Sequence, residues 1–381
     1  MSRLPGTMTA LHLVGNGGPE MLVLRHDVPL PVPAADEVLV RVRACGMNNT
    51  DVNTRVGWYS KSVTGATGSA GFGSEAVQDA GWGGGGLTFP RIQGADPCGE
   101  VVAVGEAVGP GLMGRRVLAD GWIRDAVDPA DRSKAGYLGS ERDGGYAQFC
   151  AIPARNVYPV ESDLSDVELA SFPCSWATAE HMLTRPALVA GETVVVTGAS
   201  GGVGSALVQL AKLRGARVVA VTSAAKFADV SACGADVCVD RASADLADAV
   251  VEAAGGTVDV LADVVGGTDF APLLDVVRRG GRYTTAGAIA GPIVDLDLRT
   301  LYLNDLELYG CTVYEPAVFE ALVGYIQRGE VRPVVAATWP LTEFREAQEA
   351  FVAKAHTGAM VIRSEERRVG KECRSRWSPY H

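Results

Sequence analysis

The sequence predicts an α/β chain in which a doubly wound parallel sheet is joined to a β-rich domain. Three observations carry this prediction. Short apolar runs alternate with helical patterns between about residues 193 and 311, as in successive βαβ units. A glycine-rich turn at residues 198–204 joins the first of these runs to a helix. The chain up to about Pro159 is rich in Gly and Pro and holds short alternating runs, which is typical of a barrel-like β domain.

The composition bounds the class of protein. The chain has 381 residues, 47% of them hydrophobic, and a formal net charge of -11. Such a chain can bury a core of about two domains, and its acidic balance argues against partners such as nucleic acid or an anionic membrane surface. We find no signal-peptide pattern and no apolar run near the ~18 residues of a membrane span, so we expect a cytoplasmic protein.

Two features are set aside from the fold. Residues 363–381 resemble translated sequencing adapter, so we treat them as an artefactual tail after Ile362. The cysteines before the tail are scattered and form no CxxC pair, so we expect buried thiols in a reducing compartment rather than disulfides. They are Cys45, Cys98, Cys150, Cys174, Cys233, Cys238 and Cys311.

The β-rich part is interrupted by residues 60–92, an insertion rich in Gly, Ser and Ala. A stretch of this kind is either a flexible loop or a functional lid. Phe72, Trp82 and Phe89 favour the lid, because their rings could cover an apolar ligand.

Helices and strands are expected in a regular order after Asp163. A helix over residues 166–183 would be capped by Asp163 or Ser165. The segment after Thr312 reads as helix, strand, helix and strand, and we expect it to return to the β-rich domain. Between these segments we expect strands at 193–196, 218–221, 237–239, 258–262, 282–285 and 306–311, and helices at 205–214, 226–233, 242–253 and 270–278.

The glycine turn is the strongest functional signal. It lies in VVVTGASGGVGSALVQLAK, with a buried strand before it and an amphipathic helix after it. Glycines here permit a tight turn and close approach of a pyrophosphate to the helix N-terminus. We therefore predict a dinucleotide-binding turn formed by Gly198, Ser200, Gly201, Gly202, Val203 and Gly204.

The end of the second strand of this unit indicates which dinucleotide binds. NAD-binding units place an Asp or Glu there, whereas this chain has Ser223 and Lys226 and no acid. A hydroxyl and an ammonium group suit a 2′-phosphate. The sequence therefore favours NADP(H) as the cofactor.

Together, the runs CGMNNTDVNTRVGWY, GASGGVG and GAMVI resemble the medium-chain dehydrogenase/reductase superfamily over nearly all of residues 8–362. The resemblance implies a discontinuous GroES-like catalytic domain at 1–164 and 312–362, and a Rossmann cofactor domain at 165–311. It also implies an active site in the cleft between them, and a homodimer.

Many members of this superfamily hold a catalytic zinc through Cys, His and Cys. The matching positions here are Asn48, Ala95 and Cys174, and only the last suits zinc. Asp96 could substitute in principle. We expect no metal, and the Asn form resembles the zinc-independent branch of quinone oxidoreductases, enone reductases and enoyl-thioester reductases.

The resemblance implies hydride transfer from NADPH to a small electrophilic substrate: a quinone, an enone or an enoyl thioester. Asn48 could donate a hydrogen bond to the developing oxyanion or could only hold the nicotinamide ribose. Tyr59 could protonate the enolate or could be an apolar wall residue. Thr50 matches a proton-relay hydroxyl of the zinc enzymes, but without zinc we expect it to bond locally.

Two turns after the fourth and fifth strands are expected at the nicotinamide, because doubly wound sheets bind ligands at the carboxyl ends of strands. Motif position assigns Val265, Gly266, Gly287 and Ala288 to these turns and Thr178 to the cofactor as well.

Two other functions remain open. One is a zinc alcohol dehydrogenase with substituted ligands, which metal analysis would identify. The other is a non-catalytic NADPH-binding protein, which would bind NADPH tightly without turnover.

Overall fold

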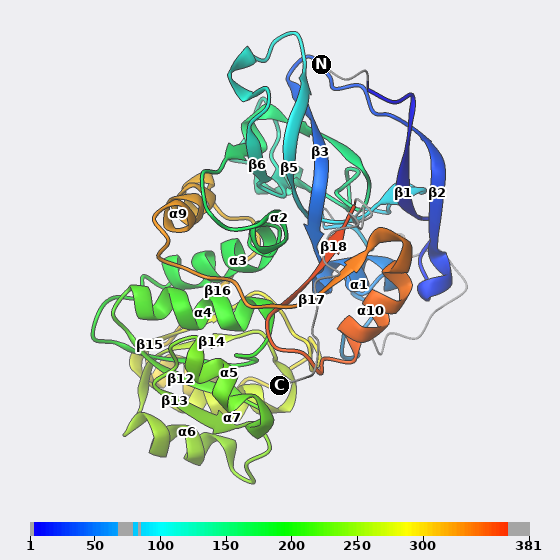
Figure 1. Cartoon of the computed structure of the whole chain (residues 1–381). Coiled ribbons are helices and arrows are strands. Elements are labelled where there is room, and N and C mark those ends of the chain that lie inside the picture. The colour runs from blue at the N-terminus through cyan, green and yellow to red at the C-terminus, as the bar shows by residue number, and fades with distance from the viewer. Residues whose placement is uncertain (1–3, 68–78, 83–84, 365–381) are drawn as a thin grey trace, which may run out of the picture.

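The computed structural model describes residues 4–67, 79–82 and 85–364. Figure 1 shows two bodies, one built around a parallel sheet with helices and the other mainly of antiparallel strands. The fold class predicted from the sequence, α/β with a doubly wound sheet and a GroES-like β domain, is confirmed.

The first body contains a six-stranded sheet in the order β13-β12-β11-β14-β15-β16, with every pairing parallel. The order reverses between β11 and β14, the switch point at which such sheets bind ligands. The elements are β11 (Thr193–Val196), α4 (Gly202–Leu213), β12 (Arg217–Thr222), α5 (Phe227–Ala232), β13 (Val237–Asp240), α6 (Leu246–Ala254), β14 (Val258–Asp263), α7 (Phe270–Asp275), β15 (Val277–Thr285), α8 (Leu298–Leu303) and β16 (Glu307–Gly310).

Most expected elements are present, but several boundaries were wrong: the strand expected from 282 starts at Val277 and the helix expected from 205 starts at Gly202. The helix expected over 166–183 is two helices, α2 (Asp166–Leu169) and α3 (Pro173–Thr184). Pro173 is the first residue of the second helix, a position where its fixed φ suits the helix and its missing N–H is harmless. The helix expected from 242 starts at Leu246, since Asp245 caps it. The helix expected to reach 278 ends at Asp275, and β15 begins two residues later.

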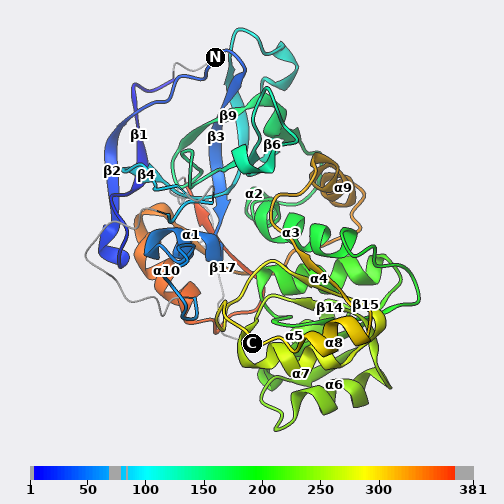
Figure 2. The same ribbon diagram turned by 180° about the vertical axis from the view of Figure 1, so that it is seen from behind.

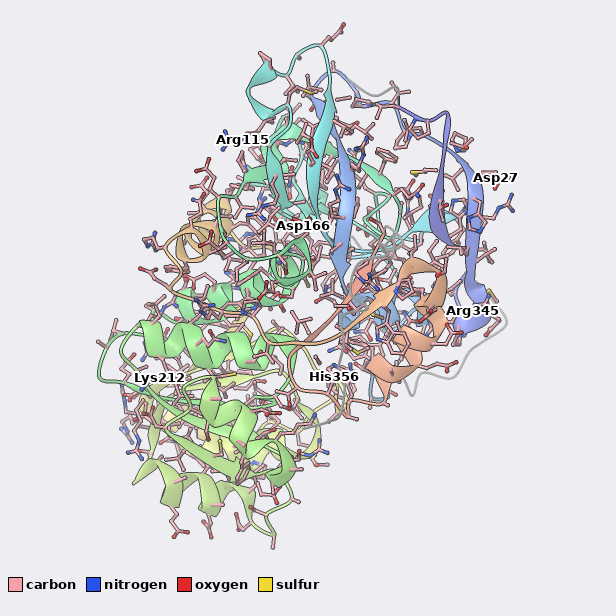
Figure 3. The ribbon with its side chains drawn as sticks, in the orientation of Figure 1. Asp27, Arg115, Asp166, Lys212, Arg345 and His356 are labelled. Atoms are coloured by element: carbon pink, nitrogen blue, oxygen red, sulfur yellow. The ribbon has the colours of Figure 1, made fainter. Side chains whose placement is uncertain are left out.

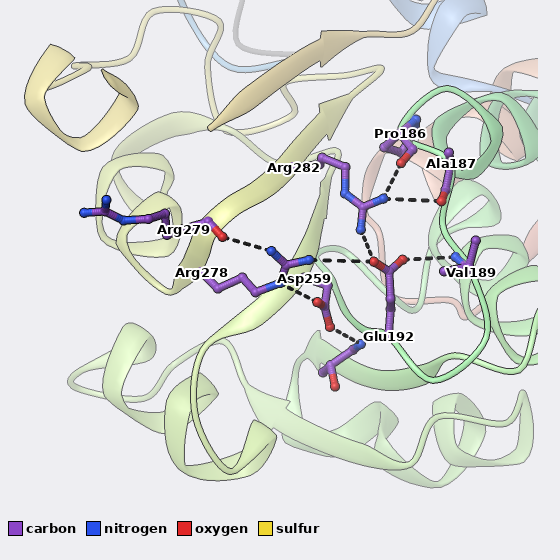
Figure 4. A network of polar contacts seen from close by, with 9 residues as sticks. Pro186, Ala187, Val189, Glu192, Asp259, Arg278, Arg279 and Arg282 are labelled. Atoms are coloured by element: carbon purple, nitrogen blue, oxygen red, sulfur yellow. Dashed lines mark hydrogen bonds and ion pairs between the residues drawn. The ribbon is translucent and has the colours of Figure 1, made fainter. Parts of the chain in front are cut away.

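Polar groups tie together the amino ends of the central strands (Figure 4). Arg278 Nε donates to Asp259 at 2.6 Å, and Asp259 in turn accepts from the backbone N–H of Thr193 at 2.8 Å. Arg282 pairs with Glu192 and donates to the carbonyl of Pro186 at 2.6 Å. This network fixes the edge of the sheet opposite to the ligand-binding edge.

The second body is built on a seven-stranded sheet in the order β10-β6-β5-β3-β18-β17, with β9 also paired to β3. A three-stranded sheet, β2-β1-β4, and the β7–β8 pair complete it. Its elements are β1 (Thr7–Leu13), β2 (Leu22–Pro29), β3 (Glu37–Gly46), α1 (Asn49–Val56), β4 (Arg91–Ile92), β5 (Asp96–Val104), β6 (Arg116–Ala119), β7 (Trp122–Ile123), β8 (Gly136–Tyr137), β9 (Phe149–Pro153), β10 (Val157–Pro159), β17 (Val335–Pro340), α10 (Phe344–Val352) and β18 (Ala359–Arg363).

The C-terminal segment returns to this second body, as Figure 2 shows from behind. After α9 (Pro316–Gln327), β17 and β18 pair in parallel, and β18 pairs with β3, with Ile362 opposite Cys45. Arg363 is the last residue of β18, and most of the expected tail lies outside the described residues.

Two expectations about composition can be compared with the described chain. Its cysteines are all free, as expected, but Cys174, Cys233 and Cys238 are only half-buried, so the expectation of burial was wrong for these three. Within the described residues, no helix combines the length and apolar character needed to span a bilayer.

Candidate active site

A cleft lies between the two bodies and collects residues from both. Its empty volume is about 1190 Å³, open mouth included. The start of α1 forms one wall, and the glycine turn before α4 forms the other. The lining includes the sequence-predicted residues Asn48, Thr50, Tyr59, Thr178, Gly198, Gly201, Gly202, Val203, Gly204, Gly287 and Ala288. Ser200, Ser223, Lys226, Val265 and Gly266 are not among its lining residues.

The glycine turn has the geometry of a phosphate cradle. Gly198 has φ +59°, a conformation that favours glycine. A Cβ on Gly204 would lie 2.2 Å from the Gly198 carbonyl oxygen, so only glycine allows the turn to pack this tightly on the helix. The first turn of α4 therefore presents free N–H groups toward the cleft, which suits the diphosphate of a dinucleotide.

A buried aspartate holds the next turn in place. Asp263 ends β14 and accepts hydrogen bonds from the backbone N–H of Val265 at 2.8 Å and from the Tyr283 hydroxyl at 2.9 Å. Asp263 also accepts a hydrogen bond from the backbone N–H of Gly266 at 3.2 Å. Gly266 has φ +62°, a conformation that favours glycine. Val265 and Gly266 thus belong to the turn beside the cleft, although they are not among the residues that line it.

Asn48 is held by a carboxylate on its neighbouring strand. Its side-chain amide Nδ2 donates to Asp96 Oδ2 at 2.9 Å, and Asp96 Oδ1 accepts from the backbone N–H of Cys174 at 2.9 Å. Burial raises the pKa of Asp96 to about 8, although the hydrogen bond from Asn48 opposes the shift. The amide carries two N–H groups, and Asp96 is the acceptor found for them among the described residues, so one N–H is left for a ligand.

Asp51 holds the backbone of Asn48 at the start of α1. Its Oδ2 accepts from the Tyr146 hydroxyl at 2.7 Å and from the backbone N–H of Asn48 at 2.8 Å. Burial raises the pKa of Asp51 to about 6, and both hydrogen bonds oppose the shift. Asp51 is thus a positioning residue that fixes the start of α1.

Tyr59 and Thr50 lie next to each other in the cleft, and Trp82 contacts both. The Tyr59 and Trp82 ring centroids are 4.3 Å apart, and Trp82 Nε1 donates to Thr50 Oγ1 at 3.3 Å. Burial raises the pKa of the Tyr59 phenol well above its ordinary value, so the hydroxyl keeps its proton at neutral pH. Trp82 comes from the insertion at 60–92; Phe72, also expected there to cover a ligand, lies outside the described residues.

Lys226 lies against the return segment rather than in the cleft. Its Nζ donates to the carbonyl oxygens of Lys354 at 2.9 Å and His356 at 2.6 Å. Figure 3 shows His356 on that segment, beside the body of the six-stranded sheet. An ammonium group has three N–H donors, so one remains for a phosphate. Ser223 lies on the same loop, directly before the short turn Ala224–Lys226.

The site does not fit a catalytic zinc. Zinc requires three protein ligands and an open position. Cys174 supplies a thiol, but both oxygens of Asp96 already accept hydrogen bonds, and the amide nitrogen of Asn48 faces Asp96. The described residues contain no group of three or more His, Cys, Asp or Glu side chains placed to hold a metal ion.

Sequence reasoning missed three groups of this site. Trp122 and Tyr137 come from the short β7–β8 pair and line the cleft, and no motif marks them. Asp263 could have been found, because an Asp at the carboxyl end of a buried strand is unusual unless it bonds a nearby turn. Asp96 was considered only as a metal ligand, whereas the structure makes it the partner of Asn48.

A phosphate cradle at the switch point of a doubly wound sheet, facing a polar corner on a second domain, defines an oxidoreductase of the dinucleotide-binding type. Comparisons with known proteins agree. A model of the alcohol dehydrogenase GroES-like domain matches residues 34–162, and a model of zinc-binding dehydrogenases matches residues 202–328. The chain belongs to the medium-chain dehydrogenase/reductase superfamily.

Individual relatives cover nearly the whole chain. A solved protein of Sinorhizobium meliloti 1021, assigned as an alcohol dehydrogenase, is 49% identical with a TM-score of 0.85, over 94% of this chain and 97% of that one. Quinone oxidoreductase of Mus musculus is 27% identical over 93% of this chain and 97% of its own. The structure of a 2-octenoyl-CoA carboxylase reductase with NADP and 2-octenoyl-CoA is 27% identical with a TM-score of 0.81, over 95% of this chain and 88% of that one.

Proposed function

We propose that the chain is an NADPH-dependent reductase that adds hydride to an electrophilic conjugated carbonyl compound (a quinone, an enone or an enoyl thioester) without a metal. The observation that carries this proposal is the Asn48–Asp96 pair, which faces the glycine turn across the cleft where zinc-dependent relatives hold their metal. Quinone oxidoreductase and the NADP-bound enoyl-CoA enzyme among the relatives support it.

The cofactor, when bound, supplies the hydride. Gly201, Gly202 and Gly204 would hold its diphosphate, and the turns at Gly266 and Gly287 would meet its nicotinamide end. Negative charge then grows on the substrate oxygen, and the free N–H of Asn48 stabilises it. Asp96 orients that amide, because its Oδ2 accepts a hydrogen bond from the Asn48 amide nitrogen.

Tyr59 is the proton donor in this proposal. Its phenol lines the cleft and stays protonated at neutral pH because burial raises its pKa. It can therefore give a proton to the enolate that hydride addition leaves. Thr50 is engaged by Trp82 and serves to place that ring.

The cofactor preference rests on Ser223 and Lys226. We expect Lys226→Ala to raise the KM for NADPH roughly tenfold and to leave the KM for NADH unchanged, since a charge-assisted hydrogen bond to the 2′-phosphate is lost. Steady-state kinetics with both cofactors measures this. Lys212→Ala is the matched control, because that lysine pairs with Asp236 on the outside of α4. Equal loss with NADH and NADPH would contradict the assignment.

The function itself is tested by NADPH consumption. Protein ending at Ile362, with a chelator present, is assayed against a quinone, a simple enone and crotonyl-CoA. We expect turnover of at least one acceptor, and activity that is insensitive to the chelator. Activity that falls on chelation and returns with added zinc would support the zinc alternative, while tight NADPH binding with no turnover would support a binding role.

A further inference from the structure

Five aromatic rings form a continuous group in the cleft, and Trp82 lies at its centre. Its ring centroid is 4.3 Å from that of Tyr59, 5.4 Å from that of Trp122 and 5.7 Å from that of Tyr137. Trp58 extends the group by an edge contact with Tyr59 at 5.7 Å. All five residues belong to the cleft lining.

The position of Trp82 is fixed, although it comes from the glycine-rich insertion. Its Nε1 donates to Thr50 Oγ1 at 3.3 Å, and its contacts with Trp122 and Tyr137 hold the opposite part of the ring system. The residue is half-buried, so part of its ring surface remains at the cleft. The planes of the Trp82 and Tyr59 rings are tilted by 39° relative to each other.

The described lining contains one acid, Asp96, and burial raises its pKa to about 8, so it is mainly neutral near pH 7. Among the described residues, no Lys, Arg or His lines the cleft. Burial raises the pKa values of Tyr59, Tyr137 and Cys174 above their ordinary ranges, so these groups are neutral near pH 7. A neutral, flat and apolar group is therefore the kind of substrate moiety that this wall can desolvate at low cost.

We propose that Trp82 is a specificity-determining residue and that it selects acceptors whose conjugated carbonyl system carries an aromatic ring. This inference rests on the proposed reductase function. A ring of the substrate stacks on the Trp82 and Tyr59 surfaces, whereas an alkyl group in the same place offers no face for stacking. The insertion at 60–92 thereby contributes to substrate choice through one side chain.

Two enones that differ in one substituent provide the test: benzylideneacetone has a phenyl group where ethylideneacetone has a methyl group. We expect the full chain to prefer the phenyl compound in kcat/KM. Trp82→Leu should reduce that preference about tenfold, mainly by raising the KM of the phenyl compound. A change of about tenfold corresponds to the loss of one aromatic stacking interaction. Trp82→Phe should keep most of the preference although it loses the bond to Thr50, which separates the ring from its hydrogen bond.

The controls distinguish a failure of this inference from a failure of the proposed reductase function. Trp339→Leu removes a tryptophan of β17 that lies outside the cleft lining, and it should leave the ratio of the two substrates unchanged. An unchanged ratio in Trp82→Leu, with turnover intact, would overturn the inference and spare the reductase function. If the unaltered protein turns over neither enone, no naphthoquinone and no crotonyl-CoA, both the inference and the reductase function are refuted.

Discussion

Replacing Asn48 with alanine should lower kcat for NADPH-dependent reduction about 100-fold. The variant loses the only side-chain N–H that we assign to the developing oxyanion, and the loss of one such donor typically costs about 3 kcal/mol in the transition state. The substitution also leaves Asp96 Oδ2 buried without its hydrogen-bond partner. Stopped-flow or steady-state kinetics at saturating cofactor measures the change in kcat.

A binding measurement separates this role from its alternative. If Asn48 only holds the nicotinamide ribose, the alanine variant will bind NADPH more weakly in a fluorescence titration and keep its kcat at saturation. Asn49→Ala is the matched comparison, since that amide accepts from Lys354 Nζ at 2.7 Å and is not bonded to Asp96. We expect Asn49→Ala to have a much smaller effect on kcat.

Gly204→Ala should abolish detectable NADPH binding and lower the melting temperature. The added Cβ would meet three backbone atoms, 2.2 Å from Gly198 O, 2.6 Å from Ala199 Cα and 2.8 Å from Ala199 C. Backbone atoms in a strand–turn–helix unit cannot move aside as a side chain can. We therefore expect the free energy of unfolding to fall by an amount at the upper end of about 1–3 kcal/mol, the usual range for overpacking. Calorimetry and a fluorescence titration measure the two effects.

Gly201→Ala provides the contrast on the same turn. A Cβ there would have one neighbour, Gly198 O at 3.5 Å, which is ordinary van der Waals contact. This variant should therefore have the melting temperature of the unaltered protein. It should nevertheless bind NADPH more weakly than the unaltered protein, because we expect its methyl group to enter the cleft. A Gly204→Ala variant that binds NADPH normally would show that the turn is not the phosphate site.

Local pattern predicted the fold well, because its signals lie close together in the chain. The strand before Gly198 and the helix after Gly204 can be read from one stretch of sequence, and the structure contains both. Pro173 shows where pattern alone was insufficient: the apolar period continues across residues 166–183, but the first helix ends at Leu169 and a second helix starts at Pro173.

The site was less predictable because its contacts cross long distances in sequence. Asn48 meets Asp96 only because β3 and β5 pair with Gly46 opposite Asp96. Lys226 was assigned from its own loop, but its hydrogen bonds go to carbonyl groups of residues 354 and 356. The ring of Trp82 was a candidate from composition, whereas its neighbours Trp122 and Tyr137 depend on how β7 and β8 pack.

The return of the chain to β3 has a consequence for the order of assembly during synthesis. All strands of the six-stranded sheet are available once Gly310 has been made, so the cofactor body can fold while the chain is still growing. The neighbouring sheet lacks β17 and β18 until Arg363 has been added, and the glycine turn also waits for Gly358, whose N–H donates to Ser200 O at 2.8 Å. Synthesis that stops between Gly310 and Gly358 therefore yields a chain with one finished body, one open sheet edge and no working cleft.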